Sequence, residues 1–259
     1  MTRILLATVA VVLLTMIGAR AAECPARIRL LVPDTAFPPL LLQDGEAFGD
    51  PPGMLVAWIQ HAVAATGCRT ELKLTRRPVP RMIYEIDDDL QDGVAGFAWS
   101  PERGQKLRFP LSEGKPDLAL VIAQTTVSLY VRQDDDSVIW DGRTLTASNP
   151  VVGVVRGQMT EVIGTARGWG LDPTNEGRSV VAQVLAKRLD IAMLSDLIDS
   201  PTFEGMTLKK LTPPVAHIEY FAPVAPRFYD RYPAFTEKFW RAFCREGRTF
   251  QKASQACRG

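Results

Sequence analysis

The stretch from Gly93 to Ser112, GVAGFAWSPERGQKLRFPLS, carries the residue best suited to chemistry in this chain. Its first third is apolar, rich in glycine and short enough for a buried strand. It then breaks at Ser100 and Pro101 into a turn that carries Glu102 and Arg103. Ligands of open α/β sheets bind just outside the carboxyl ends of the strands, and a guanidinium group recognises carboxylates well. The pattern makes Arg103 a candidate anion clamp, and a surface ion pair with Glu102 is the alternative.

A second candidate site follows another apolar run. Residues Val151–Val155 are predicted to form a buried strand, and the segment RGQMTE after it turns the chain into a helix. Free backbone N–H groups at the start of a helix form an anion site without any special side chain. Phe37, which two prolines follow, is either held near a strand end or packed in the core. Trp99 lines a cleft or belongs to the core.

Composition indicates an ordinary globular protein with an export signal. The chain has 259 residues, 46% hydrophobic and 23% charged, which is enough for one large domain or two modest ones. Residues 1–21 carry Arg3, the apolar run ILLATVAVVLL and the small-x-small site Ala19-Arg20-Ala21, as a secretory signal peptide does. The run is short of the roughly 20 residues that a membrane span needs. We expect this signal to be cleaved and the mature protein to be exported.

Charge and histidine content exclude two classes of partner. Without Arg3 and Arg20 of the expected signal peptide, 28 of the 30 basic residues remain against 29 acidic ones. The sequence has no cluster of lysine and arginine of the kind that binds nucleic acid. The chain contains no CxxC spacing and only His61 and His217 as histidines. We therefore expect no metal site and no cofactor.

Four cysteines in an exported chain predict disulfide bonds. They are Cys24, Cys68, Cys244 and Cys257, which allow three pairings. We favour Cys24 with Cys68 and Cys244 with Cys257. The second bond would close a short loop between two C-terminal helices.

Strand and helix patterns alternate in two blocks. In the first block, Ile28–Val32 and Cys68–Leu74 are predicted strands on either side of a helix over Leu55–Ala65. The alternating run Asp117–Val131 is long for one strand, so we predict two strands with a crossing at Gln124–Val127.

The second block and the C-terminus continue the pattern. A helix over Arg178–Arg188 leads into the strand Asp190–Leu194, and the strand Ile218–Val224 returns the chain. Phe235–Cys257 is predicted to form two helices split at Glu246-Gly247. We expect an α/β protein of two lobes, each a mixed sheet flanked by helices, with two hinge crossings. The expected division is residues 22–124 and 217–259 for the first lobe, 128–210 for the second, and 125–127 and 211–216 for the hinge.

The order of three motifs resembles the type 2 periplasmic solute-binding proteins of amino-acid and polar-solute ABC transporters, the extracellular family 3 type. SPER at 100–103 with FPLS at 109–112 is similar to that family's T-x-x-R and F-S-x-P-Y. VGVVRG at 152–157 is similar to its V-G-V-x-x-G turn, and LAKRLDIA at 185–192 to its L-x-x-G-R-x-D-A. The resemblance covers nearly all of the mature chain and implies the two-lobed fold.

The resemblance also implies site residues. Arg103 matches the arginine that holds a ligand carboxylate, Phe37 lies where the family places an aromatic ring over the ligand, and Asp34 lies near Phe37. Asp196 resembles the acid that pairs with the ligand amine, although its spacing is one residue long, and Ser195 is the alternative for that place.

Other positions depart from the pattern. Gln158 and Met159 stand where the family has small hydroxyl residues, so only their backbone donors carry over, and Thr160 is one place further along. Gly96–Ala98 lacks the hydroxyls that bind amino-acid backbones, and Trp99 is a further cleft candidate. The departures make an anionic or aromatic solute an alternative to an α-amino acid.

Three functions follow from these observations. The first is a monomeric, non-enzymatic binding protein that captures a small polar or anionic solute and delivers it to an inner-membrane ABC permease. The second is a periplasmic enzyme resembling cyclohexadienyl dehydratases, for which Glu102, Asp34 and Asp196 are the candidate acids and bases. The third is a partner protein that has lost its ligand.

Overall fold

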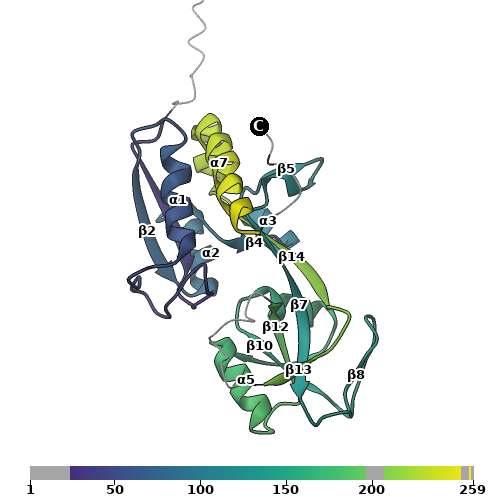
Figure 1. Cartoon of the computed structure of the whole chain (residues 1–259). Helices are drawn as coiled ribbons and strands as arrows, with labels where there is room; N and C mark the ends of the chain where they lie inside the picture. The colour runs from purple at the N-terminus through teal and green to yellow at the C-terminus, as the bar shows by residue number, and fades with distance from the viewer. Residues whose placement is uncertain (1–23, 197–206, 252–256, 258–259) are drawn as a thin grey trace, which may run out of the picture.

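The computed structural model describes residues 24–196, 207–251 and 257, so the expected signal peptide lies outside the described residues. The protein consists of two lobes, which Figure 1 shows one above the other, with the strands β7 and β14 running between them. The first lobe contains β1 (Arg27–Pro33), α1 (Met54–Ala64), β2 (Glu71–Arg77), α2 (Val79–Asp87), β3 (Gly93–Val94), β4 (Phe97–Ala98), α3 (Pro101–Lys106), β5 (Leu111–Ser112), β6 (Lys115–Pro116), the 3-10 helix η1 (Leu118–Leu120), α6 (Pro226–Arg231) and α7 (Pro233–Gln251). The second contains β8 (Ile139–Trp140), β9 (Leu145–Thr146), β10 (Val151–Val155), α4 (Met159–Ala166), β11 (Gly170–Thr174), α5 (Gly177–Leu185), β12 (Ile191–Ser195) and β13 (Leu208–Lys210). The two lobes share β7 (Ala123–Arg132) and β14 (Ala216–Phe221).

The first lobe is built on a parallel three-stranded sheet. Strand β1 lies between β2 and β3, so Leu30 pairs with Leu74 on one side and with Gly93 on the other. A Cβ at Gly93 would lie 2.8 Å from the carbonyl oxygen of Pro223, so this position requires glycine. The sheet therefore accepts the returning C-terminal part of the chain at close range.

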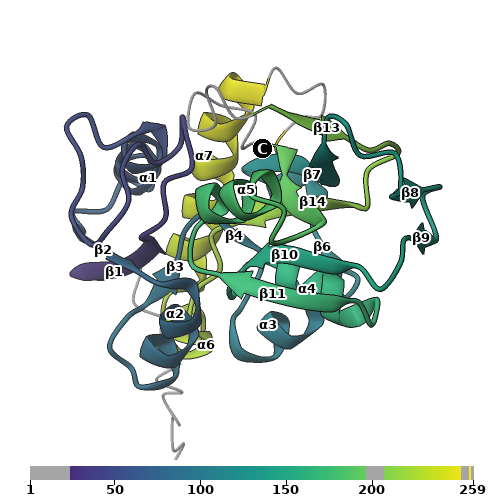
Figure 2. The same ribbon diagram turned by 90° about the horizontal axis from the view of Figure 1, so that it is seen from below.

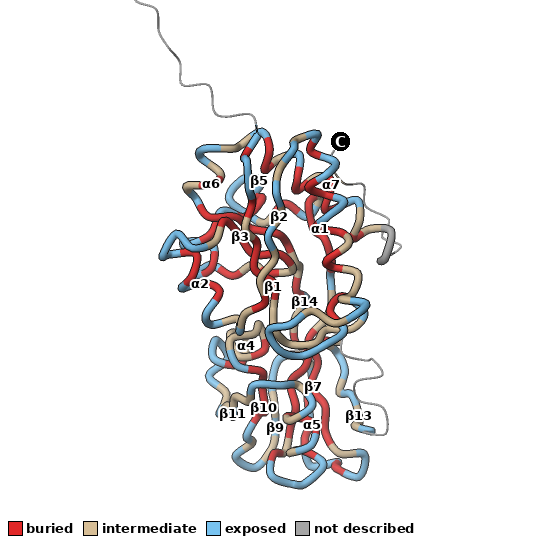
Figure 3. Tube along the Cα trace, turned by 90° about the vertical axis from the view of Figure 1, so that its left-hand side faces the viewer, coloured by how far each residue is buried: buried red, intermediate tan, exposed pale blue. Residues whose placement is uncertain are grey.

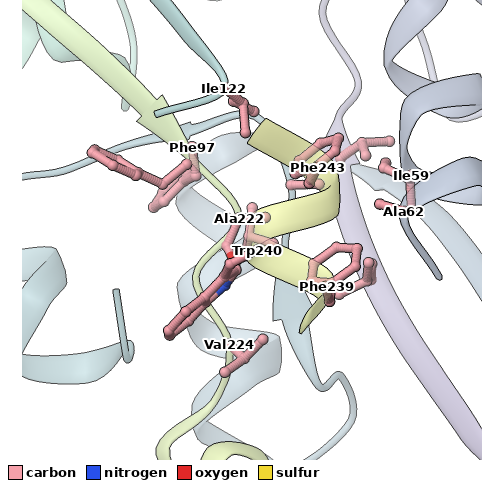
Figure 4. Packing of buried hydrophobic residues seen from close by; sticks show 14 of the residues in the cluster. Ile59, Ala62, Phe97, Ile122, Ala222, Val224, Phe239, Trp240 and Phe243 are labelled. Atoms are coloured by element: carbon pink, nitrogen blue, oxygen red, sulfur yellow. The ribbon is translucent and has the colours of Figure 1, made fainter. Parts of the chain in front are cut away.

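Aromatic side chains of α7 form the centre of the first core. Phe235, Phe239 and Phe243 are fully buried and stack in sequence, with ring centroids 6.4 and 5.5 Å apart. Figure 4 shows Phe239 and Phe243 beside Ile59 and Ala62 of α1. The spacing of four residues places these rings on one side of the helix, which explains why α7 packs along α1.

The prediction of two C-terminal helices is wrong, because α7 is continuous through Gly247. A Cβ at this position would overlap the carbonyl oxygen of Ile122. Gly247 thus permits a close approach of helix and chain instead of ending the helix.

The main sheet of the second lobe has a helix on each face, and β8 and β9 form a separate two-stranded sheet. Along β10, Val152 and Val154 belong to the core that α4 covers, and Val155 belongs to the core beneath Val180 of α5. Side chains of a strand alternate between the two faces, so both faces of β10 are apolar and buried. Figure 2 shows α4 and α5 beside β10 and β11.

Strand β7 corrects a second prediction. The structure has η1 followed by one unbroken strand, where the sequence predicted two strands joined at Gln124–Val127. Its start pairs with β14 and its end with β13 on the same side, while β12 pairs with the other side from Val127 onward. A ten-residue strand is stable here because successive partners satisfy its backbone groups.

β14 also pairs with β4, which links the sheet to the first lobe. The residue boundaries of the lobes stay a prediction.

Both expected disulfide pairings are confirmed. Cys24 is bonded to Cys68, and Cys244 in α7 is bonded to Cys257. Because α7 is one helix, the second bond joins that helix to the segment after it.

Figure 3 shows buried residues concentrated along the inner strands and on α7. In the described part of the chain, no helix has the length and apolar character that crossing a membrane would require.

Candidate functional site

A cavity of about 60 Å³ lies where the two lobes meet. The first lobe contributes the loop after β1, the start of α2, and the segment from β4 into α3, while the second contributes the start of α4 and the end of β12. Most of its lining is aliphatic or aromatic. The branched aliphatic residues are Leu40, Leu41, Leu55, Val79, Ile122 and Ile218.

Arg103 is the one charged side chain among the described residues that line the cavity. Ser100 caps the short helix α3 by accepting a hydrogen bond from the backbone N–H of Arg103, at 3.3 Å, which sets the direction of the arginine. Its guanidinium lies 3.9 Å from the ring centre of Phe97. Only 8% of the residue is exposed, and burial lowers the pKa of the guanidinium to about 10.

Two carbonyl groups hold this guanidinium in place. Nη1 donates to the oxygen of Ala98, at 2.8 Å, within the first lobe. Nη2 donates to the oxygen of Gly157, at 2.9 Å, in the second lobe. Among the described residues, no carboxylate lies within ion-pair distance of Arg103. The arginine is therefore a buried cation that bridges the lobes through neutral acceptors.

The start of α4, which follows Gly157, forms the opposite wall. Gly157 has φ +71°, and a Cβ there would lie 2.8 Å from the ring of Pro80 at the start of α2. Its N–H donates to the carboxylate of Glu161, and the hydroxyl of Thr160 accepts from the N–H of Val155 at 3.3 Å. The helix start thus satisfies part of its own polar groups and presents Met159 to the cavity.

Tyr220 lies in the cavity wall and was missed by the sequence reasoning. Burial raises the pKa of its phenol to about 12, against smaller lowering effects of a hydrogen bond with Ser195 and of Arg103, so the phenol is neutral. Phe37 packs against it with ring centres 5.9 Å apart. The alternation of Ile218 and Tyr220 along β14 was the available signal, since both face the cavity.

A buried arginine positions the loop that carries Phe37. Arg76 donates to the carbonyl oxygens of Pro33, at 3.1 Å, and Ala47, at 2.8 Å. Within the loop, the N–H of Ala36 donates to the carboxylate of Asp44 at 2.6 Å. These contacts fix both ends of the loop, and so the place of Phe37.

Six of the predicted site residues line the cavity, and three do not. The six are Arg103, Phe37, Gln158, Met159, Thr160 and Ser195. Of the others, Asp34 is half-buried, and burial raises the pKa of its carboxyl. Trp99 packs against Gly104 in α3 and against the first core.

Asp196, the third, lies among polar groups of the second lobe. Its carboxylate accepts hydrogen bonds from Lys210 at 2.7 Å, Tyr130 at 2.8 Å, Ser128 at 3.1 Å, and Thr126. Burial raises the pKa of this carboxyl, but the hydrogen bonds together outweigh it and lower the pKa below its ordinary value. Asp196 is therefore ionised and already paired with a cation.

This arrangement is suited to binding an anion that carries an apolar group. A guanidinium without a carboxylate partner attracts an anion, and the apolar walls stabilise the remainder of the ligand. In the part of the chain that the structure describes, no group of three or more His, Cys, Asp or Glu side chains is placed to hold a metal ion.

No protein-family model matches this sequence, and the comparison with curated proteins returns no match. Solved structures do match. The substrate-binding protein of an amino acid ABC transporter is 14% identical, with coverage of 88% of this chain and 100% of the other and a TM-score of 0.64. Holo ArgBP from T. maritima is 15% identical, covering 88% and 92%, with a TM-score of 0.62. An ancestral amino-acid-binding protein, a precursor of cyclohexadienyl dehydratase, is 11% identical, covering 89% and 92%, with a TM-score of 0.59. Over nearly its whole described length, this chain has the fold of the type 2 periplasmic binding proteins.

Proposed function

We propose that this protein is a periplasmic solute-binding protein that closes its two lobes on a small carboxylate-bearing solute and presents the solute to an inner-membrane ABC permease. The observation that carries the proposal is Arg103, a buried cation between the lobes without a carboxylate partner among the described residues. A buried charge is unfavourable unless it is paired. A bound carboxylate supplies that pair and so favours the closed arrangement.

The neighbouring structures support a binding role. One of them is the substrate-binding protein of an amino acid ABC transporter, and two more are amino-acid binders by description. Closure between lobes needs a bend near the shared strands, and we assign it to residues 125–127 and 211–216. The disulfides fit an oxidising compartment such as the periplasm.

A dehydratase is supported less well by the geometry. General acid–base catalysis needs a titratable group within reach of the substrate. Glu102 is exposed on α3, and neither Asp34 nor Asp196 lines the cavity. Turnover of prephenate by the purified protein would decide for the enzyme.

The test is a thermal-shift screen of residues 22–259 against amino acids and small organic acids, with two variants in parallel. A solute at 100 times its Kd stabilises the folded protein by roughly 2.7 kcal/mol, which is easily measured. We expect a carboxylate to stabilise the wild type and Arg108→Met, but not Arg103→Met. Arg108 is the matched control because it lies in the same segment, exposed, against the ring of Tyr229.

Two results would contradict the proposal. Binding that survives Arg103→Met would remove the arginine from the site. Silence across the whole library would favour the partner-protein function instead, since that function requires no small solute.

A further inference from the structure

We infer that the solute is a small carboxylic acid that has an apolar chain and carries no ammonium group. This inference rests on the proposed function and names the class of ligand for the same cavity. Its basis is the charge of the described lining, which consists of one cation, Arg103, and no acid. An α-amino acid brings a positive charge that must lie close to its own carboxylate, and therefore close to this guanidinium.

An ammonium group in this cavity would meet a like charge. Like charges close together disfavour one another, and the effect is strong where water is excluded. The carbonyl oxygens of Ala98 and Gly157, which face the guanidinium, already accept hydrogen bonds from it. The phenol of Tyr220 is neutral, so it offers an ammonium group no counter-charge.

Three nearby carboxylates are engaged by other groups of the protein. Asp196 is ion-paired with Lys210 and accepts hydrogen bonds from three hydroxyl groups. Glu161 accepts from the N–H of Gly157, and Asp44, in an adjoining pocket that shares Phe37 and Gln158, accepts from that of Ala36. A ligand amine at any of these would have to share a carboxylate that the protein already uses within itself.

The walls of the cavity suit a ligand with an alkyl chain. Its volume of about 60 Å³ accommodates several water molecules, and so a small organic acid. Propionate and butyrate are small acids whose alkyl chains would contact aliphatic walls of this kind. Donors for the carboxylate are the guanidinium, the hydroxyls of Tyr220 and Ser195, and the first N–H groups of α4.

The experiment compares butyrate with three analogues by isothermal titration calorimetry on residues 22–259. Butanamide keeps the shape and removes the charge, 2-aminobutyrate adds an ammonium next to the carboxylate, and 4-aminobutyrate adds one at the far end. We expect butyrate to bind at least tenfold more tightly than each of the others. Arg103→Met should abolish butyrate binding and Arg108→Met should leave it unchanged.

The outcomes separate the inference from the proposed function. If either amino acid binds more tightly than butyrate and loses binding in Arg103→Met, the inference is overturned and the proposed function stands. If butanamide equals butyrate, Arg103 does not recognise the carboxylate, and both fail. If Arg103→Met does not fold, the four ligands measured on the wild type still test the inference. Arg103→Lys keeps the charge but loses the planar guanidinium, so it should weaken butyrate binding about tenfold or more.

Discussion

A methyl group added at Gly157 should prevent the two lobes from meeting as they do here. Its Cβ would lie 2.8 Å from two ring carbons of Pro80 in the first lobe, where ordinary contacts begin near 3.4 Å. The overlap of about 0.6 Å, between a rigid ring and a backbone-anchored methyl, cannot be relieved by a rotamer change. For Gly157→Ala we expect solute affinity to fall at least tenfold, which corresponds to about 1.4 kcal/mol.

A second cost comes from the backbone, and a matched variant measures it. Gly157 has φ +71° and Gly168 has φ +69°, but a Cβ at Gly168 has nothing within 4 Å. A non-glycine residue in this conformation costs about 1–2 kcal/mol. Both variants should therefore lose about 1 kcal/mol of unfolding free energy in urea, whereas only Gly157→Ala should lose affinity.

A double-mutant cycle tests the contact itself. Pro80→Ala removes the two ring carbons that the new methyl would meet, so Pro80→Ala with Gly157→Ala should recover most of the lost affinity. Affinity is measured by calorimetry with the carboxylate that the screen identifies. If Gly157→Ala and Gly168→Ala bind that solute equally well, or if Pro80→Ala gives no recovery, the lobes do not close through this contact.

Two further changes test the lobes separately. Asp196→Asn should destabilise the protein by about 2 kcal/mol at pH 7, measured by urea unfolding, because its carboxylate accepts several hydrogen bonds and pairs with Lys210. The control is Asp136→Asn. Asp136 also pairs with a lysine, Lys209, but its side chain is 94% exposed, so this change should cost under about 1 kcal/mol. Since the pKa of Asp196 is lowered in the folded protein, this contribution is complete above the ordinary pKa of about 3.9 and is lost as the pH falls through the folded value, so an unchanged difference at pH 2 would contradict the assignment. Gly247→Ala should cost about 2–3 kcal/mol, although alanine is the better helix former, because its methyl would overlap the carbonyl of Ile122; a neutral or stabilising result would show that α7 does not pass so close to Ile122.

Local spacing determined much of this protein. The alternation of strands and helices and the placing of Arg103 in the first turn after β4 depend on residues close together in the chain. Each was predictable because hydrophobic periodicity and turn residues act over a few positions. The same reasoning correctly predicted the strand at Val151–Val155 and the helix after it.

The tertiary structure decided what depends on distant partners. Gly247 suggested a helix end because glycine is common there, but the helix continues through it. Its close approach to Ile122 explains why glycine stands at this position. Likewise, the alternation within β7 cannot reveal that three other strands pair along it in turn. Sequence spacing holds no information on such non-local contacts.

The site shows the same division. The sequence identified Arg103 by its neighbours, but its bond to Gly157 joins residues 54 apart, and Asp196 is engaged by residues 14 to 70 positions away. Tyr220 joins the cavity because β14 pairs with β7 and β4 at once. Residue types and local order therefore determined which groups were available, and the folding of distant segments against one another determined which of them remain for a ligand.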